Sequence, residues 1–125
     1  MKLFDTSIAI DHLRGRPEAT ELVVGSLRNG EEVAASELVR FELIAGIRPD
    51  EHEDLEDFFS GVGWVPLTEP VARRGGDLAA RFRRMYPGID DVDYLIAATV
   101  LELDAEFLTT NVRHFPMLTG LRAAY

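Results

Sequence analysis

The chain has 125 residues, 46% of them hydrophobic, and a formal net charge of −9 at pH 7. This size and composition predict one folded domain with one core, and no apolar run approaches the length of a membrane span. Cysteine is absent and the three histidines are scattered, so any metal ion would be bound mainly by oxygen, which favours magnesium or manganese over zinc.

The first half of the chain alternates predicted strands and helices. A short strand at 2–4 ends at Asp5, and helices are expected at about 6–13 and 18–27, separated by the breaker Gly15-Arg16-Pro17. A second strand at 32–35 precedes a helix that Ser36 caps and that ends near Ala45.

The second half continues the alternation. A helix at 49–59 precedes a short strand at 64–67, and a long amphipathic helix spans 69–86. The turn Pro87-Gly88 leads to a helix at 92–102 and a strand at 106–109, after which the last residues form a fifth strand or a tail. The order predicts an α/β fold with a central parallel sheet of four to five short strands, flanked by helices on both faces.

Carboxylates stand at predicted strand ends and helix starts, where the working site of an open α/β sheet lies. Asp5 ends the first strand, although an Asp there often only caps the next turn. Glu42 is expected on the same side of its helix as Leu38, Phe41 and Ala45. A carboxylate within an apolar arc is costly unless it pairs with a buried arginine or binds a metal ion.

Three acids open the helix at 92–102, namely Asp90, Asp91 and Asp93. Acids complement the dipole of a first helical turn, but one cap needs only one acid. We assign Asp93 to the site and the other two to capping or supporting roles. Asn111 offers a neutral oxygen after the last strand, and His114 is either a substrate contact or a structural side chain.

These acids would repel one another if they clustered, unless protons or cations intervened. A divalent ion relieves that repulsion, and oxygen ligands with open water positions suit metal-assisted hydrolysis of phosphodiesters. The net charge of −9 argues the other way, because it repels a nucleic-acid backbone at long range.

Four segments carry the motifs of one known family. They are Leu3-Phe4-Asp5-Thr6-Ser7, the stretch 36–46 around Glu42, the stretch 93–99 that begins at Asp93, and the stretch 108–115 around Asn111. In this order, and in a chain of this length, they resemble PIN domains and specifically VapC toxins. The resemblance covers nearly the whole chain.

The resemblance implies that residues 1–125 form one PIN domain with endoribonuclease activity that depends on Mg²⁺ or Mn²⁺. Asp5 and Asp93 would hold the ion, and Glu42 would complete the site or orient the attacking water. Asn111 would steady the ion's water shell or the substrate. Many PIN domains carry a fourth acid where Asn111 stands, so a second metal site would be less charged.

The resemblance also implies partners. These are an RNA substrate, a VapB-type antitoxin whose tail covers the site, and a second copy of the chain in a homodimer. DNA would be reached only through the antitoxin, and no membrane is expected. An acid follows as early as Asp5, before any apolar stretch typical of a signal peptide, so a cytoplasmic protein is predicted.

The helix at 69–86 carries arginines along one arc. They either supply phosphate contacts that the acidic surface lacks, or form a solvated face with Arg73–Asp77–Arg81 pairs at i, i+4 spacing. The opposite arc holds Val71, Leu78, Phe82 and Met85. The predicted RNA or partner contacts are Arg73, Arg81 and Arg84 on this helix, together with Arg113 and His114.

Other classes fit less well. A phospho-acceptor signalling domain needs a lysine late in the chain, but the only lysine is Lys2. A phosphatase with an Asp nucleophile needs a second Asp where Ser7 stands, and a P-loop motif is absent. A non-catalytic PIN-like binding module remains the alternative, because the acids could persist in a scaffold that binds without cutting.

Overall fold

The computed structural model describes all 125 residues, Met1–Tyr125. Its four strands form one parallel sheet in the order β3-β2-β1-β4. β1 (Lys2–Phe4) pairs with β2 (Val33–Ser36) on one side and with β4 (Glu106–Leu108) on the other, and β3 (Gly63–Val65) forms the edge beyond β2. The predicted α/β class and parallel sheet are confirmed, with the lower of the two predicted strand numbers.

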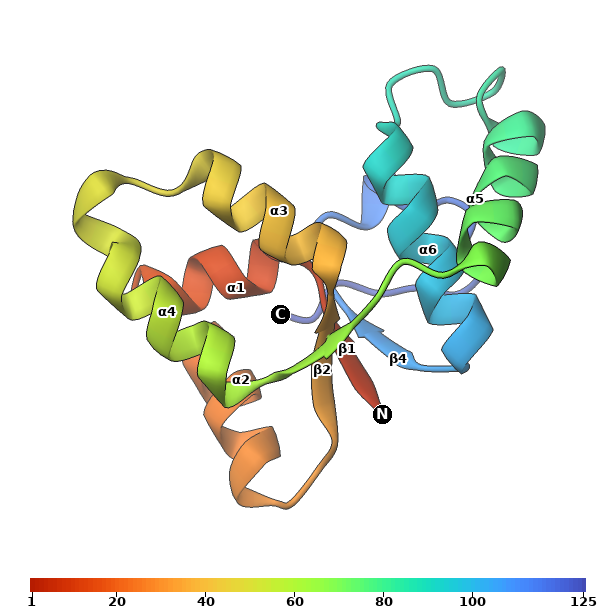
Figure 1. Cartoon of the computed structure of the whole chain (residues 1–125). Coiled ribbons are helices and arrows are strands. Elements are labelled where there is room, and N and C mark those ends of the chain that lie inside the picture. The colour runs from red at the N-terminus through yellow and green to blue at the C-terminus, as the bar shows by residue number, and fades with distance from the viewer.

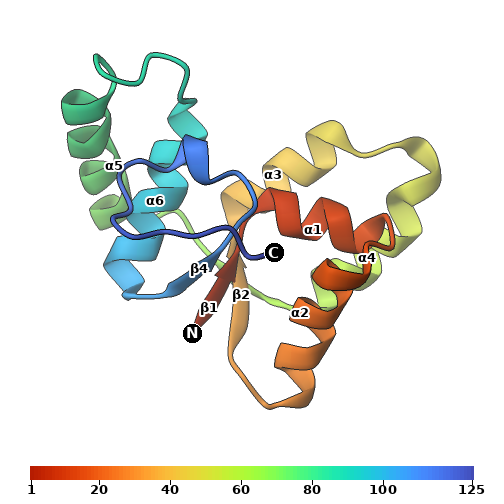
Figure 2. The same cartoon turned by 180° about the vertical axis from the view of Figure 1, so that it is seen from behind.

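Helices cover both faces of the sheet, as predicted (Figures 1 and 2). α1 (Thr6–Leu13), α2 (Pro17–Arg28) and α4 (His52–Gly61) lie on one side, and α5 (Glu69–Phe82) and α6 (Asp91–Leu103) lie on the other. α3 (Glu37–Gly46) starts where β2 ends, and two 3-10 turns, η1 (Pro49–Glu51) and η2 (Val112–His114), complete the chain. None of the helices combines the length and the apolar composition needed to cross a membrane.

Side-chain caps begin three of the helices. Ser36 Oγ accepts a hydrogen bond from the Leu38 N–H at 3.1 Å, which confirms the predicted cap of α3. Asp90 Oδ1 accepts from the Val92 N–H at 3.3 Å, so Asp90 rather than Asp91 caps α6. These caps satisfy N–H groups that have no partner inside the helix.

Three predicted boundaries are wrong. The helix expected through Tyr86 ends at Phe82 and continues as a turn toward Pro87, and Met85 is 68% exposed rather than part of the apolar arc. The segment at 49–59 splits into η1 and α4. β3 ends at Val65 because Pro66 has no N–H to donate to the sheet.

The fifth strand, which was one of two predicted outcomes, does not form; the chain after η2 runs as a tail without regular structure.

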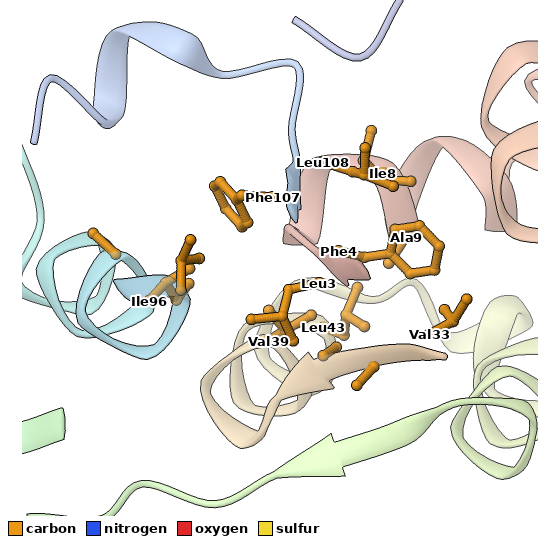
Figure 3. Close-up of a cluster of buried hydrophobic side chains, with 14 of the residues drawn as sticks. Leu3, Phe4, Ile8, Ala9, Val33, Val39, Leu43, Ile96, Phe107 and Leu108 are labelled. Atoms are coloured by element: carbon orange, nitrogen blue, oxygen red, sulfur yellow. The ribbon is translucent and has the colours of Figure 1, made fainter. Parts of the chain in front are cut away.

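The core joins the sheet to the helices on both faces. Phe4 and Ile8 are almost fully buried, and the strands are apolar on both faces, as expected of a covered parallel sheet. Figure 3 labels Leu3, Phe4, Ile8, Ala9, Val33, Val39, Leu43, Ile96, Phe107 and Leu108 of this cluster. Because this packing holds β1 and β4 rigidly, the residues that follow both strands start from fixed positions.

α5 and α6 approach closely at Gly75. A Cβ atom at this position would lie 2.8 Å from Leu95 Cδ2, which is closer than two carbon atoms pack. A side chain at position 75 would therefore push the Leu95 side chain aside where α5 packs on α6, the helix that carries Asp93.

Candidate metal and active site

Asp5 is the most firmly held of the predicted site residues. It follows β1 and is 3% exposed. Its Oδ2 accepts a hydrogen bond of 2.7 Å from Thr109 Oγ1 and a longer one of 3.3 Å from Ser7 Oγ. Burial raises the pKa of Asp5, and the hydrogen bonds from Thr109 and Ser7 oppose that rise. The two hydroxyls therefore orient the carboxylate and favour its ionised form.

Asp93 lies in the first turn of α6 and is 8% exposed. Its Oδ2 lies 3.1 Å from His114 Nδ1. Burial raises the pKa of Asp93 to about 6, His114 lowers it, and the charges of Asp5 and Glu42 raise it further. The predicted acids therefore lie within electrostatic range of one another, and His114 belongs to the same cluster.

Glu42 reaches the cluster from α3. It is half-buried, and its Oε1 accepts a 2.7 Å hydrogen bond from Thr6 Oγ1, next to Asp5. Burial raises the pKa of Glu42, the hydrogen bond from Thr6 lowers it, and the charge of Asp5 raises it.

The apolar arc predicted around Glu42 is wrong. Phe41 is 62% exposed and Ala45 is also exposed, whereas Val39 and Leu43 form the buried side of α3. Only the narrow side of α3 that carries Val39 and Leu43 is buried, and Glu42 lies at the border of this buried side. The link to Thr6, not an apolar surrounding, is what ties Glu42 to the site.

Asn111 and Arg113 follow β4 and are exposed. The Asn111 N–H donates to Thr109 Oγ1 at 3.0 Å, and its carbonyl accepts from the His114 N–H at 3.0 Å. The side chain of Asn111 makes no hydrogen bond within the chain. Its predicted role toward an ion or substrate stays a prediction, as does that of Arg113.

Hydroxyl groups form the part of the site that sequence reasoning missed. Thr109 is fully buried and donates to Asp5, while Ser7 Oγ accepts from the Thr110 N–H at 3.1 Å. The available signal was a pair of hydroxyl residues close after each of two strands: Thr6-Ser7, one residue beyond the end of β1, and Thr109-Thr110, directly after β4. Because β1 and β4 are neighbouring parallel strands, both pairs lie at the same edge of the sheet.

The arginines of α5 and of the turn after it divide into two kinds. Arg73 pairs with Glu69 at 2.6 Å and Arg74 with Glu102 of α6 at 3.1 Å, so the predicted Arg73–Asp77–Arg81 pairs do not form. Arg81, near the end of α5, and Arg84, in the turn that follows it, are exposed and form no ion pair. These two arginines are the ones free to contact an anionic partner.

The carboxylates of this cluster suit a divalent ion that keeps part of its water shell. No group of three acidic or histidine side chains is arranged closely enough to enclose a metal ion. Mg²⁺, however, keeps several waters and is commonly held by one or two carboxylates together with substrate phosphates. Both acids are buried: Asp5 has no ion-pair partner, and Asp93 has only His114. They match a hydrated ion better than a preformed cage.

Comparison with known proteins identifies the family of the chain. A family model described as the PIN domain matches residues 2–117. The chain is 61% identical over 125 residues to Ribonuclease VapC19 of Mycobacterium tuberculosis, covering 100% of both proteins. It is 38% identical to Ribonuclease VapC10 of the same organism, covering 100% of this chain and 93% of that protein.

The solved structures include a similar chain in a toxin–antitoxin complex from Klebsiella pneumoniae. That chain has a TM-score of 0.78 and 25% sequence identity, and the match covers 100% of this chain and 98% of the other.

The four-stranded parallel sheet with acids at its carboxyl edge is the architecture of a small α/β domain of the PIN type. The chain belongs to the PIN-domain family. Because it is similar over its full length to two VapC ribonucleases, it also belongs to the VapC group within that family. The resemblance predicted from four sequence segments is thereby confirmed.

Proposed function

We propose that this protein is the toxin of a type II toxin–antitoxin pair and an endoribonuclease that hydrolyses RNA phosphodiester bonds with the help of Mg²⁺ or Mn²⁺. The observation that carries the proposal is the pair of buried carboxylates, Asp5 and Asp93, which share one end of the sheet without an arginine or lysine partner. The identity to two named ribonucleases supports the reaction class.

Each residue of the cluster has a role in this proposal. Asp5 and Asp93 hold the ion, which when bound polarises the phosphodiester and stabilises the charge that develops on it. Thr109 and Ser7 keep the Asp5 carboxylate oriented. Glu42 has a raised pKa, which suits a group that orients the attacking water or accepts its proton. Asn111 contacts the water shell or the substrate.

The wider assignment follows the VapC group. The protein acts in the cytoplasm as one PIN domain over residues 1–125, forms a homodimer, and is inhibited by a VapB-type antitoxin whose tail covers the site. DNA is reached only through that antitoxin. In this proposal RNA contacts the unpaired arginines Arg81 and Arg84, and Arg113 and His114 complete the contact surface. Arg73, predicted among these contacts, is paired with Glu69 and contributes less.

Cleavage by purified protein tests the proposal. We expect cleavage of RNA with Mg²⁺ or Mn²⁺, none with a chelator, and none by Asp5→Asn. The exposed Asp57→Asn on α4 is the matched control and should cleave like the wild type. Equal cleavage by wild type and Asp5→Asn would identify a contaminating nuclease and favour the non-catalytic binding module.

Growth of a bacterial host tests the toxin assignment separately. Induced expression of the wild type should arrest growth, and Asp5→Asn should abolish the arrest. Normal growth despite abundant wild-type protein would contradict the toxin assignment.

A further inference from the structure

The tail after η2 returns to the site and contacts α1. Figure 2 shows this last segment crossing the molecule and ending beside α1. The Ala124 N–H donates a 2.8 Å hydrogen bond to the Thr109 carbonyl, and the Tyr125 hydroxyl donates a 2.5 Å hydrogen bond to Asp11 Oδ2. The tail therefore joins α1 to the segment that follows β4.

Three side chains form what we call the Tyr125 clasp: Tyr125, Asp11 and Arg16. Arg16 Nη1 lies 3.5 Å from Asp11 Oδ2, and the guanidinium lies 4.7 Å from the centroid of the Tyr125 ring. Burial and the hydrogen bond to Asp11 raise the pKa of Tyr125. The phenol therefore stays protonated and keeps its role as a donor at neutral pH.

The tail that the Tyr125 clasp holds contacts one peptide group of the site, the one between Thr109 and Thr110. The carbonyl of Thr109 accepts from Ala124 at 2.8 Å, and the N–H of the next residue, Thr110, donates to Ser7 Oγ at 3.1 Å. Both ends of this peptide plane are thus held, one by the tail and the other by the hydroxyl network. Rotation of the plane would turn Thr109, whose hydroxyl bonds Asp5 at 2.7 Å.

We propose that Tyr125 is a positioning residue: its bond to Asp11 holds Ala124 against the Thr109 carbonyl and so fixes the hydroxyl that orients Asp5. This inference rests on the proposed ribonuclease function. Tyr125 lies 120 positions from Asp5 in the sequence of 125 residues, and its side chain contacts Asp11 and Arg16. It acts only through Thr109.

Tyr125→Phe tests the inference because it removes the donor and keeps the ring that stacks on Arg16. We expect kcat for RNA cleavage to fall about tenfold with KM unchanged, since small misplacement of reacting groups lowers the rate of chemistry. In the metal-free protein, the Thr110 and Asn111 amides should exchange about tenfold faster with solvent, while amides of the core strands keep their protection. Tyr86→Phe, at a tyrosine that is 42% exposed, is the matched control and should change neither quantity.

A double-mutant cycle with Asp11→Ala isolates the bond itself. If Tyr125 acts through Asp11, the double variant should lose no more activity than the more impaired single variant. Additive losses would overturn the assignment of the Tyr125–Asp11 bond.

The amide measurement separates this inference from the proposed function. An inactive wild type would reject the ribonuclease proposal, yet faster exchange confined to Thr110 and Asn111 would still establish the positioning of this segment. Unchanged exchange and unchanged kcat in Tyr125→Phe would overturn the inference. A rise in KM alone, or faster exchange throughout the protein, would also overturn it, because either result assigns Tyr125 a different role.

Discussion

Charges on the surface of α5 and α6 and charges at the end of the sheet are arranged in opposite ways. On the surface, Asp91 forms an ion pair with Arg83, and Arg74 pairs with Glu102. These groups are exposed, and such pairs contribute at most about 1 kcal/mol to stability. Two residues after Asp91, Asp93 is 8% exposed and has only His114 as a partner.

The difference shows what each region is built for. Exposed carboxylates are solvated by water or paired with arginine. They therefore keep the protein soluble with little loss of folding stability. Buried acids without arginine partners destabilise the folded protein until a proton or a cation joins them. Such an arrangement is retained where the bound cation is used, as in the proposed ribonuclease site.

Replacing Asp93 or Asp91 by Asn gives the sharpest test of the difference between buried and exposed acids. Asp93→Asn should lower RNA cleavage on the order of 10³-fold, because it removes one of two charged ligands of the ion that stabilises the transition state. Asp91→Asn should stay within about twofold, since it loses only a surface pair. Cleavage is measured on the same RNA at saturating Mg²⁺, and similar losses in both variants would break the comparison.

The pH dependence of stability tests the same contrast without RNA. The pKa of Asp93 in the folded protein is about 6 and its ordinary value is 3.8, so the folded protein binds this proton more tightly than the unfolded chain. The free energy of unfolding should therefore fall as pH rises between these two values and stay low above them. In metal-free protein, Asp93→Asn should be more stable than wild type at pH 8, by on the order of 3 kcal/mol, and equal to it at pH values well below the ordinary pKa of Asp93.

Chemical denaturation at several pH values measures this difference. Saturating Mg²⁺ should remove most of it by stabilising the wild type. Asp91→Asn serves as the control and should not show the pH-dependent gain. If the free energy of unfolding changes with pH in the same way for wild type and Asp93→Asn, then ionisation of the buried Asp93 does not destabilise the folded protein, and the prediction is wrong.

The sequence predicted the sheet and the positions of Asp5 and Asp93 well, because both depend on local patterns. A short apolar run followed by an acid marks the end of β1, and an acid in a first turn marks the start of α6. Strand ends of a parallel sheet meet at one edge, so the convergence of these residues followed from the fold class.

Residues whose roles depend on tertiary contacts could not be predicted in this way. Thr109 is 104 positions from Asp5, and no periodicity links them. Glu42 was selected for an apolar arc that is exposed in the structure, and its tie to the site is a single bond from Thr6. α5 ends earlier than its sequence pattern suggests, because no neighbouring element covers Met85.

Replacing His114 should have an intermediate effect on cleavage, smaller than the loss of Asp93 and larger than the loss of a surface charge. His114→Ala removes the only ion-pair partner of Asp93 and should lower cleavage about tenfold, as loss of a group that orients a metal ligand does. Because His114 lowers the pKa of Asp93, the variant should also lose more activity at pH 6 than at pH 8. The exposed His52→Ala is the control, and a uniform loss at both pH values would show that His114 acts without influencing Asp93.

The arginines of α5 and of the turn after it should give the smallest effect, and those without an ion-pair partner should matter most. Arg81 and Arg84 have no ion pair, whereas Arg73 and Arg74 are already neutralised by glutamates. Reversing Arg81 and Arg84 to Glu should raise KM for RNA a few-fold. The slope of log KM against log salt should fall by about 0.7 for each phosphate group that an arginine no longer neutralises.

Reversing Arg73 and Arg74 instead changes the net charge by the same amount in the same region, α5 and the turn after it, so it controls for long-range repulsion of the RNA backbone. If only a general field acts, both double variants will weaken binding equally and both will respond equally to salt. A larger loss and a reduced salt slope for the Arg81 and Arg84 variant alone would show that the end of α5 and the turn after it contact phosphate directly. In that case the acidic protein attracts RNA at its unpaired arginines while its unpaired carboxylates bind the ion.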